Sequence, residues 1–239
     1  MSAFAELCAS TNFSFLRAGS HPEEMAAQAK ALGLAGLGVA DRNTLAGVVR
    51  AHVAAKEQGL RLIVGARLVF EDGVPDCIVY PRGRAAYARL TRLLTRGNLR
   101  APKGECWLTF ADFLEHAEGL RTIVLPGRDL PPCGGGGREA AGGGAAQDMA
   151  QAAPPRFLLH RPPPVALRAT PSPQGGGNMT TYLSAIREAC GQVWLAAPMR
   201  FDGEDRRNLR VLKEIAQQTG ARLIATTEPL MHTPERRAL

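Results

Sequence analysis

Short apolar runs alternate with amphipathic stretches along most of this chain. The runs have the length and aliphatic character of buried strands, whereas the stretches between them repeat apolar residues at the three- and four-residue steps of a helix. The predicted strands cover residues 5–9, 37–40, 60–70 (interrupted at Gly65), 77–80, 121–125, 193–196 and 223–226. Because strands alternating with helices form parallel sheets or barrels, the pattern predicts an α/β fold with any active site at the carboxyl ends of the strands.

Residues that favour helix starts precede several of the amphipathic stretches. Ser20 stands before Pro22 and two glutamates, and we predict it as the N-cap of the first helix. Asn43 is the predicted N-cap of the second helix. Thr109 is the predicted N-cap of a short helix over residues 111–116. Further helices are predicted after the strand at 77–80 and over residues 183–189 and 205–219.

The alternation breaks between residues 127 and 178. This segment holds 11 of the 26 glycines and 9 of the 17 prolines, a composition at which a segment usually fails to pack. We predict a disordered Gly/Pro-rich insert, with one strand at 156–160, between two parts of the fold at 1–126 and 179–239. A local shift of reading frame is the alternative, because GC-rich codons yield Ala, Gly, Pro and Arg in any frame.

The excess positive charge is concentrated in one segment. The chain carries 29 Lys and Arg against 22 Asp and Glu, and the stretch between Cys77 and Gly104 contains no acid. Four arginines of this stretch recur at helical steps, namely Arg89, Arg92, Arg96 and Arg100. Such a stripe can contact successive phosphates of a nucleic acid, and it can equally be the solvated face of an amphipathic helix.

Composition and thiol distribution exclude several classes of protein. Hydrophobic residues make up 45% and charged residues 21% of the chain, as in ordinary globular proteins. No apolar run reaches the length of about 18 residues that a membrane span requires, and the first ten residues lack the basic start of a secretory signal. The five cysteines are scattered without a Cys-x-x-Cys pair, which favours reduced thiols. We therefore predict a cytoplasmic protein without a membrane partner.

Several segments, taken in order, carry a resemblance to a known family. They read ELCASTNFSFL from residue 6, SHPEE from 20, DRNTLAGVVRAH from 41, LRLIVGARL from 60 and APKGECWLTFADFLEHAEGL from 101. Together they resemble the amino-terminal PHP domain (named for polymerase and histidinol phosphatase) of bacterial C-family DNA polymerases, and the last of them points to the error-prone branch. The resemblance covers 1–126 and 179–239 and implies a distorted β/α barrel of seven strands.

The resemblance also implies a cluster of divalent metals at the strand ends, where active members hydrolyse phosphate esters. In this chain most of the positions that would supply ligands carry other residues. These lost positions are Cys8, Ser10, Arg42, Arg67 and Leu230. Two of the replacements are arginines, which stay protonated and repel a divalent cation. No catalytic residue is therefore predicted.

Three residual candidates for a metal site remain, namely Asp41, Glu228 and His232. The two carboxylates could hold at most one weakly bound divalent cation through water molecules. Alternatively, Asp41 caps or orients the helix after the second strand and Glu228 is a loop acid. We expect the second arrangement and no cofactor, because each lost ligand raises the cost of dehydrating a metal.

We interpret the chain as the PHP portion of an error-prone DNA polymerase, with a structural role in damage-tolerant DNA synthesis and a degenerate metal site. The resemblance places the polymerase active site beyond this domain, so the chain alone is not expected to synthesise DNA. The expected partners are the remainder of the polymerase or other replication and translesion proteins, with DNA as a further candidate. A stand-alone metal-dependent phosphoesterase and a non-functional truncated remnant are the alternatives.

Overall fold

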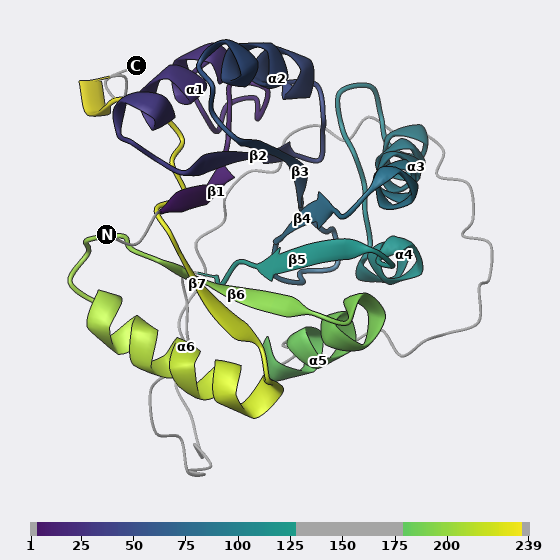
Figure 1. Ribbon diagram of the computed structural model, residues 1–239. Helices are drawn as coiled ribbons and strands as arrows, with labels where there is room; N and C mark the ends of the chain where they lie inside the picture. Colours follow the sequence, from purple (N-terminus) through teal and green to yellow (C-terminus); the bar gives the residue numbers. More distant parts are fainter. Residues whose placement is uncertain (1–3, 128–178, 236–239) are drawn as a thin grey trace, which may run out of the picture. The chain divides into compact units, whose positions relative to one another are not determined.

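The computed structural model describes residues 4–127 and 179–235 (Figure 1). The predicted insert and its strand at 156–160 lie outside these residues. Within the described part of the chain, seven strands follow one another in a single sheet. They are β1 (Ala5–Ala9), β2 (Gly36–Arg42), β3 (Leu62–Leu68), β4 (Cys77–Pro81), β5 (Leu120–Val124), β6 (Val193–Pro198) and β7 (Arg222–Thr226). The sheet curves until β7 contacts β1, so the predicted seven-stranded α/β barrel is confirmed.

Six helices of the described residues cover the outside of this barrel in pairs (Figure 1). They are α1 (Pro22–Ala31), α2 (Val48–Glu57), α3 (Arg84–Arg100), α4 (Phe110–His116), α5 (Met179–Cys190) and α6 (Asp205–Thr219). The pairs α1–α2, α3–α4 and α5–α6 each pack together over a different set of strands. None of these helices combines the length and the apolar composition of a membrane span.

The fourth strand departs from the predicted parallel arrangement. β4 runs antiparallel to both β3 and β5, whereas the other neighbouring strands are parallel. The connection from β3 to β4 covers only residues 69–76, and a parallel crossover needs about a dozen residues or more. The alternation of strands and helices favoured parallel neighbours, and β4 departs from that arrangement because the short connection forces a hairpin-like return.

Side chains alternate between the barrel interior and the helical layer. Ile78 and Tyr80 of β4 belong to an interior cluster that includes Cys8, whereas Cys77 and Val79 pack outward against the helices. This two-residue period is the one that a strand buried on both faces produces. The interior is filled by side chains, so chemistry is confined to the ends of the strands.

Two of the three predicted helix caps were wrong. Thr109 caps α4 as expected, but His21 rather than Ser20 is the N-cap of α1. Asn43 does not start a helix, since α2 begins after Gly47. Instead Asn43 has a φ of 49°, and its side chain hydrogen-bonds to backbone groups of the β3–β4 connection and of Cys106. A polar residue that favours caps is used here to hold a turn.

The ring of Tyr80 crosses the barrel interior and requires glycine on a neighbouring strand. Its hydroxyl donates a hydrogen bond to the carbonyl oxygen of Leu7 on β1. A Cβ atom at Gly65 would lie 2.5 Å from the Tyr80 ring and 2.5 Å from the carbonyl oxygen of Val79. The strand β3 runs through Gly65 without the predicted interruption. This glycine therefore serves close packing instead of ending a strand.

We expect Gly65→Ala to lower the free energy of unfolding by about 2–3 kcal/mol, because the added methyl group must displace a backbone carbonyl and a buried ring. Gly83→Ala is the matched control, since a Cβ atom at Gly83 meets nothing within 4 Å. Urea denaturation of both variants measures the effect. Equal midpoints for Gly65→Ala and Gly83→Ala would show that the barrel interior adjusts without cost.

Candidate functional site

A polar cleft with a volume of about 800 Å³ opens where the strands end. It is bordered by the residues that follow β1, β5, β6 and β7, by the last residues of β2 and β3, and by the residues that precede β4. Five of the positions singled out from the sequence line it, namely Ser10, Arg42, Arg67, Glu228 and Leu230. Asp41, Cys8 and His232 do not. The structure thus brings most of the candidate positions to one cleft, although it separates the three residues that could still bind a metal.

Asp41 is buried beside the cleft, with 2% of its surface exposed. Its Oδ1 accepts hydrogen bonds of 2.7 Å from the backbone N–H of Thr11 and 2.7 Å from the hydroxyl of Ser14. Its Oδ2 accepts a hydrogen bond of 2.8 Å from the hydroxyl of Thr11. Burial raises the pKa of this carboxyl above 3.8, although the bonds from Ser14 and Thr11 oppose the rise. Asp41 therefore ties the loop after β1 to the end of β2.

Glu228 lies in the cleft between two guanidinium groups. Its Oε1 is 3.6 Å from Nη1 of Arg67, and its Oε2 is 3.9 Å from Nη2 of Arg200. Arg67 also donates from Nε and Nη2 to Oδ2 of Asp76, each at 2.8 Å. These four side chains alternate in charge across the cleft. A guanidinium cannot lose its proton in a protein, so the two arginines are permanent cations at this place.

Cys8 and His232 face away from the cleft. Cys8 is 2% exposed in the barrel interior, and burial raises the pKa of its thiol to about 12. Binding a metal there would first require this buried thiol to lose its proton. The Nδ1 atom of His232 lies 2.7 Å from Oγ of Ser20 and 3.7 Å from a carboxylate oxygen of Glu24, beside the start of α1. Ser20, predicted as a helix cap, thus positions this histidine.

The donor set does not fit the cluster of divalent cations that the fold implies. Asp41 already accepts three hydrogen bonds, Glu228 lies between arginines, and Cys8 is buried in the barrel interior and does not line the cleft. Across residues 4–127 and 179–235, no group of three or more His, Cys, Asp or Glu side chains could hold a metal ion. The residues present at the strand ends therefore supply charge and hydrogen bonds but no metal cage.

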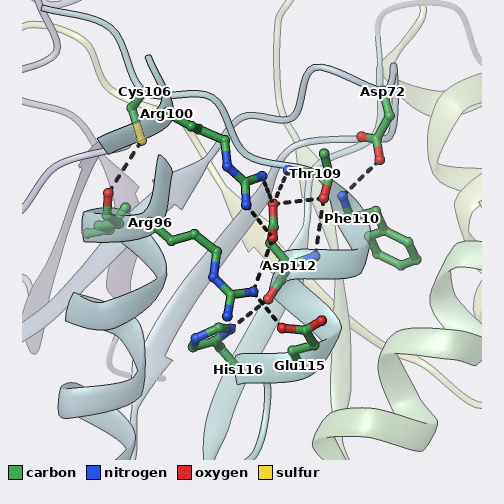
Figure 2. Close-up of polar contacts among 10 residues, drawn as sticks. Asp72, Arg96, Arg100, Cys106, Thr109, Phe110, Asp112, Glu115 and His116 are labelled. Atoms are coloured by element: carbon green, nitrogen blue, oxygen red, sulfur yellow. Dashed lines mark hydrogen bonds and ion pairs between the residues drawn. The ribbon is translucent and has the colours of Figure 1, made fainter. Parts of the chain in front are cut away.

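The arginine stripe on α3 is largely engaged in ion pairs with α4 and the loop after it. Arg100 donates two hydrogen bonds, of 2.6 and 3.1 Å, to the carboxylate of Asp112. Arg96 lies 2.5 Å from a carboxylate oxygen of Glu115 and 3.3 Å from Asp112. Figure 2 shows both guanidinium groups converging on this aspartate.

The two remaining arginines of the stripe differ from each other. Arg89 pairs with Glu118, 2.5 Å away, whereas Arg92 is exposed and has no carboxylate partner within residues 4–127 and 179–235. From the sequence, the four arginines could form either a phosphate-binding stripe or the solvated face of a helix. The structure shows a third arrangement, in which three of the four charges bind acids of the same chain.

Acidification should weaken the contact between α3 and α4. Burial would raise the pKa of Asp112, but hydrogen bonds from Arg100 and Thr109 outweigh it and hold the pKa below 3.8. A carboxyl whose pKa is lowered in the folded state contributes stability above its unfolded pKa and loses it as the pH falls through the folded value. We therefore expect Asp112→Asn to cost about 1–2 kcal/mol at pH 7, with the difference from the wild type shrinking below about pH 4.

Urea denaturation at several pH values measures this effect. Glu188→Gln is the control, because this exposed carboxylate on α5 makes no ion pair with the described residues, and its small effect should not change with pH. A difference between Asp112→Asn and the wild type that stays constant from pH 7 to about 3 would contradict the ion-pair explanation.

Comparison with known proteins agrees with this architecture. The profile of the PHP domain family matches residues 7–138. The chain belongs to the PHP domain family. The error-prone DNA polymerases of Caulobacter vibrioides and Brucella abortus are each 41% identical to it, over 236 and 245 residues that cover 99% and 100% of this chain. Those alignments cover 18% and 19% of the polymerases, so this PHP chain spans about a fifth of the length of the relatives that it matches.

Solved structures show the same fold at low sequence identity. A protein of Bifidobacterium adolescentis, provisionally assigned as a metal-dependent phosphoesterase, superposes with a TM-score of 0.61 at 13% identity, covering 98% of this chain and 90% of that one. An amidohydrolase from Chromobacterium violaceum gives 0.55 at 12% identity, covering 96% and 88%. These similarities concern the barrel alone.

Sequence reasoning missed one buried acid of this PHP domain. Glu6 of β1 is 2% exposed, and its Oε1 accepts hydrogen bonds from the backbone N–H of Cys8 (2.7 Å) and the hydroxyl of Thr226 (2.6 Å). Its Oε2 accepts from both the N–H and the hydroxyl of Thr227, each at 2.8 Å. The signal was a lone acid within a predicted buried strand. Glu6 joins β1 to the end of β7, where the sheet itself makes no ladder.

Proposed function

We propose that this chain is the PHP module of an error-prone DNA polymerase and that it acts there as a structural base, without metal-dependent phosphoesterase activity. The relatives that are 41% identical across the whole chain support the first part. The second part rests on the side chains at the strand ends. In the polymerase, the module would serve damage-tolerant DNA synthesis by supporting the domains that carry it.

The observation that carries the structural role is Arg67 and its ion pairs in the cleft. Its guanidinium lies 2.8 Å from Asp76 and 3.6 Å from Glu228, which is the one residual metal candidate that lines the cleft. A divalent metal there would face a fixed positive charge, while the carboxylate of Glu228 would have to leave two arginines. The guanidinium groups thus supply the positive charge that a metal would supply in a phosphoesterase.

Metal analysis and an activity assay on the purified chain test this proposal. We expect far less than one equivalent of bound Mn²⁺ or Zn²⁺ after dialysis, and no hydrolysis of p-nitrophenyl phosphate above that of the Asp41→Ala variant. The thermal midpoint should also be the same in EDTA and in excess Mn²⁺, because a ligand that binds only the folded state raises it. Near-stoichiometric metal together with hydrolysis that Asp41→Ala abolishes would establish a phosphoesterase instead.

We infer that the main partner is the remainder of such a polymerase. The support is the length of the relatives, of which this chain matches about a fifth. Co-expression with a segment corresponding to the rest of a relative should yield a one-to-one complex on size-exclusion chromatography. Failure to form this complex, together with non-cooperative unfolding of the chain, would favour a non-functional remnant. DNA contact through α3 stays a prediction, and Arg92 is the one arginine of the four-residue stripe without an acidic partner among the described residues.

A further inference from the structure

The cleft at the strand ends carries more positive than negative charge. Four arginines line it, namely Arg17, Arg42, Arg67 and Arg200. Three acids line it as well, namely Asp76, Asp202 and Glu228. Asp76 and Glu228 are committed to Arg67 and Arg200. The two other arginines, Arg17 and Arg42, are exposed and make no ion pair within the described residues.

Two of these cations stand directly beside each other. Arg42 and Arg67 are register partners on the parallel strands β2 and β3, and both border the cleft. Like charges on adjacent strands at the same register destabilise a sheet unless an opposite charge lies between them. Asp76 compensates the charge of Arg67, whereas Arg42 has no compensating acid among the described residues. The sheet therefore holds an uncompensated guanidinium at the mouth of an 800 Å³ cleft.

We propose that this cleft binds a phosphate-bearing anion without a metal, through Arg42 and Arg17, with Arg67 and Arg200 completing the cationic wall. Guanidinium groups bind phosphate oxygens through paired, charge-assisted hydrogen bonds, and they need no cation to do so. The proposal rests on the proposed function, because a retained metal cluster would bind the anion by other means. The arginine stripe on α3 does not offer an equivalent site, since three of its four arginines form ion pairs with acids of the same chain.

The phosphate group could come from free phosphate or from a nucleotide. Phe15 and Phe201 are 81% and 85% exposed and adjoin the cleft residues Ser14 and Arg200 in sequence. Exposed aromatic rings next to arginines stack nucleic-acid bases. A nucleotide would therefore gain affinity over inorganic phosphate from these rings, and Phe201→Ala would remove the gain, whereas free phosphate would be insensitive to this substitution.

Calorimetric titration of the full chain in EDTA, at low salt, with inorganic phosphate and separately with thymidine monophosphate tests the site. We expect saturable binding that weakens with added salt, and Arg42→Gln and Arg17→Gln should each weaken it about tenfold. Arg61→Gln is the matched control. It removes the same charge from an exposed arginine that precedes β3, lies outside the cleft and makes no ion pair with the described residues, and it should change the affinity by less than about twofold.

The outcomes separate this inference from the proposed function. No saturable binding with or without metal, or equal weakening by Arg61→Gln and Arg42→Gln, would overturn the anion site and leave the structural role intact. Binding that appears only when Mn²⁺ is added would overturn both proposals. Tighter binding of the nucleotide that is lost in Phe201→Ala would support the site and identify a nucleotide as its ligand. Equal affinity for phosphate and nucleotide would also support the site and identify free phosphate as its ligand. Thermal midpoints unchanged from the wild type confirm that the glutamine variants are folded.

Discussion

Glu6→Ala is expected to lower the free energy of unfolding by about 4 kcal/mol, among the largest effects of a single substitution in this chain. The substitution leaves four buried or half-buried donors without an acceptor, namely the N–H groups of Cys8 and Thr227 and the hydroxyls of Thr226 and Thr227. It also releases the contact between β1 and β7. Because a domain of this kind is stable by about 5–15 kcal/mol, the substitution should remove between about a quarter and most of that free energy.

Glu6→Gln should be almost as harmful, and the reason is geometric. Each carboxylate oxygen accepts one backbone N–H, from Cys8 at Oε1 and from Thr227 at Oε2. Backbone donors cannot reverse, so the amide nitrogen of glutamine must face one of them and lose that hydrogen bond. Urea denaturation compares both variants with Glu214→Gln, an exposed acid on α6 whose replacement should cost less than about 0.5 kcal/mol. Wild-type stability in Glu6→Gln would show that Glu6 does not close the barrel.

The barrel was predictable because its strands are short apolar runs and most of them are followed by a segment with the hydrophobic period of a helix. The antiparallel direction of β4 could also have been predicted, since the connection of residues 69–76 is too short for a crossover. The wrong caps have a different cause. Ser20 and Asn43 favour helix starts locally, yet their side chains bind His232 and the backbone at Val69, which lie distant in sequence. Local propensity is weaker than such tertiary hydrogen bonds.

The position of the candidate site was predictable from the sequence, but the ion pairs between its side chains were not. Strand ends of a barrel meet at one face, so residues such as Ser10, Arg42 and Arg67 had to approach one another. Their partners were not visible in the sequence, because Asp76 lies on a loop and Arg200 follows a strand formed after the undescribed segment. For the same reason the acids that neutralise α3 were missed, although Asp112 and Glu115 lie within the segment quoted for the family resemblance.

Asp41→Ala is expected to lower the free energy of unfolding by about 3 kcal/mol, because it leaves the N–H and hydroxyl of Thr11 and the hydroxyl of Ser14 without their acceptor. Asp41→Asn should cost only about 1 kcal/mol. The oxygen of asparagine can accept from the Thr11 N–H and the Ser14 hydroxyl, and its nitrogen would face only the Thr11 hydroxyl, which can turn and accept. This tolerance distinguishes Asp41 from Glu6, where both oxygens receive backbone donors.

The way in which the stability of Asp41→Asn depends on pH and on Mn²⁺ shows whether Asp41 is a structural carboxylate or a metal ligand. Because burial raises the pKa of Asp41 above 3.8, its ionised form is penalised in the folded state, and this penalty is relieved as the pH falls through the raised value. The advantage of the wild type over Asp41→Asn should therefore grow on acidification from pH 7, opposite to the behaviour expected of Asp112→Asn. Urea midpoints across this range, repeated in EDTA and in Mn²⁺, measure it. If Mn²⁺ stabilised the wild type but not Asp41→Asn, the carboxylate would be a metal ligand, and the hydrogen bonds to Thr11 and Ser14 would not be its main role.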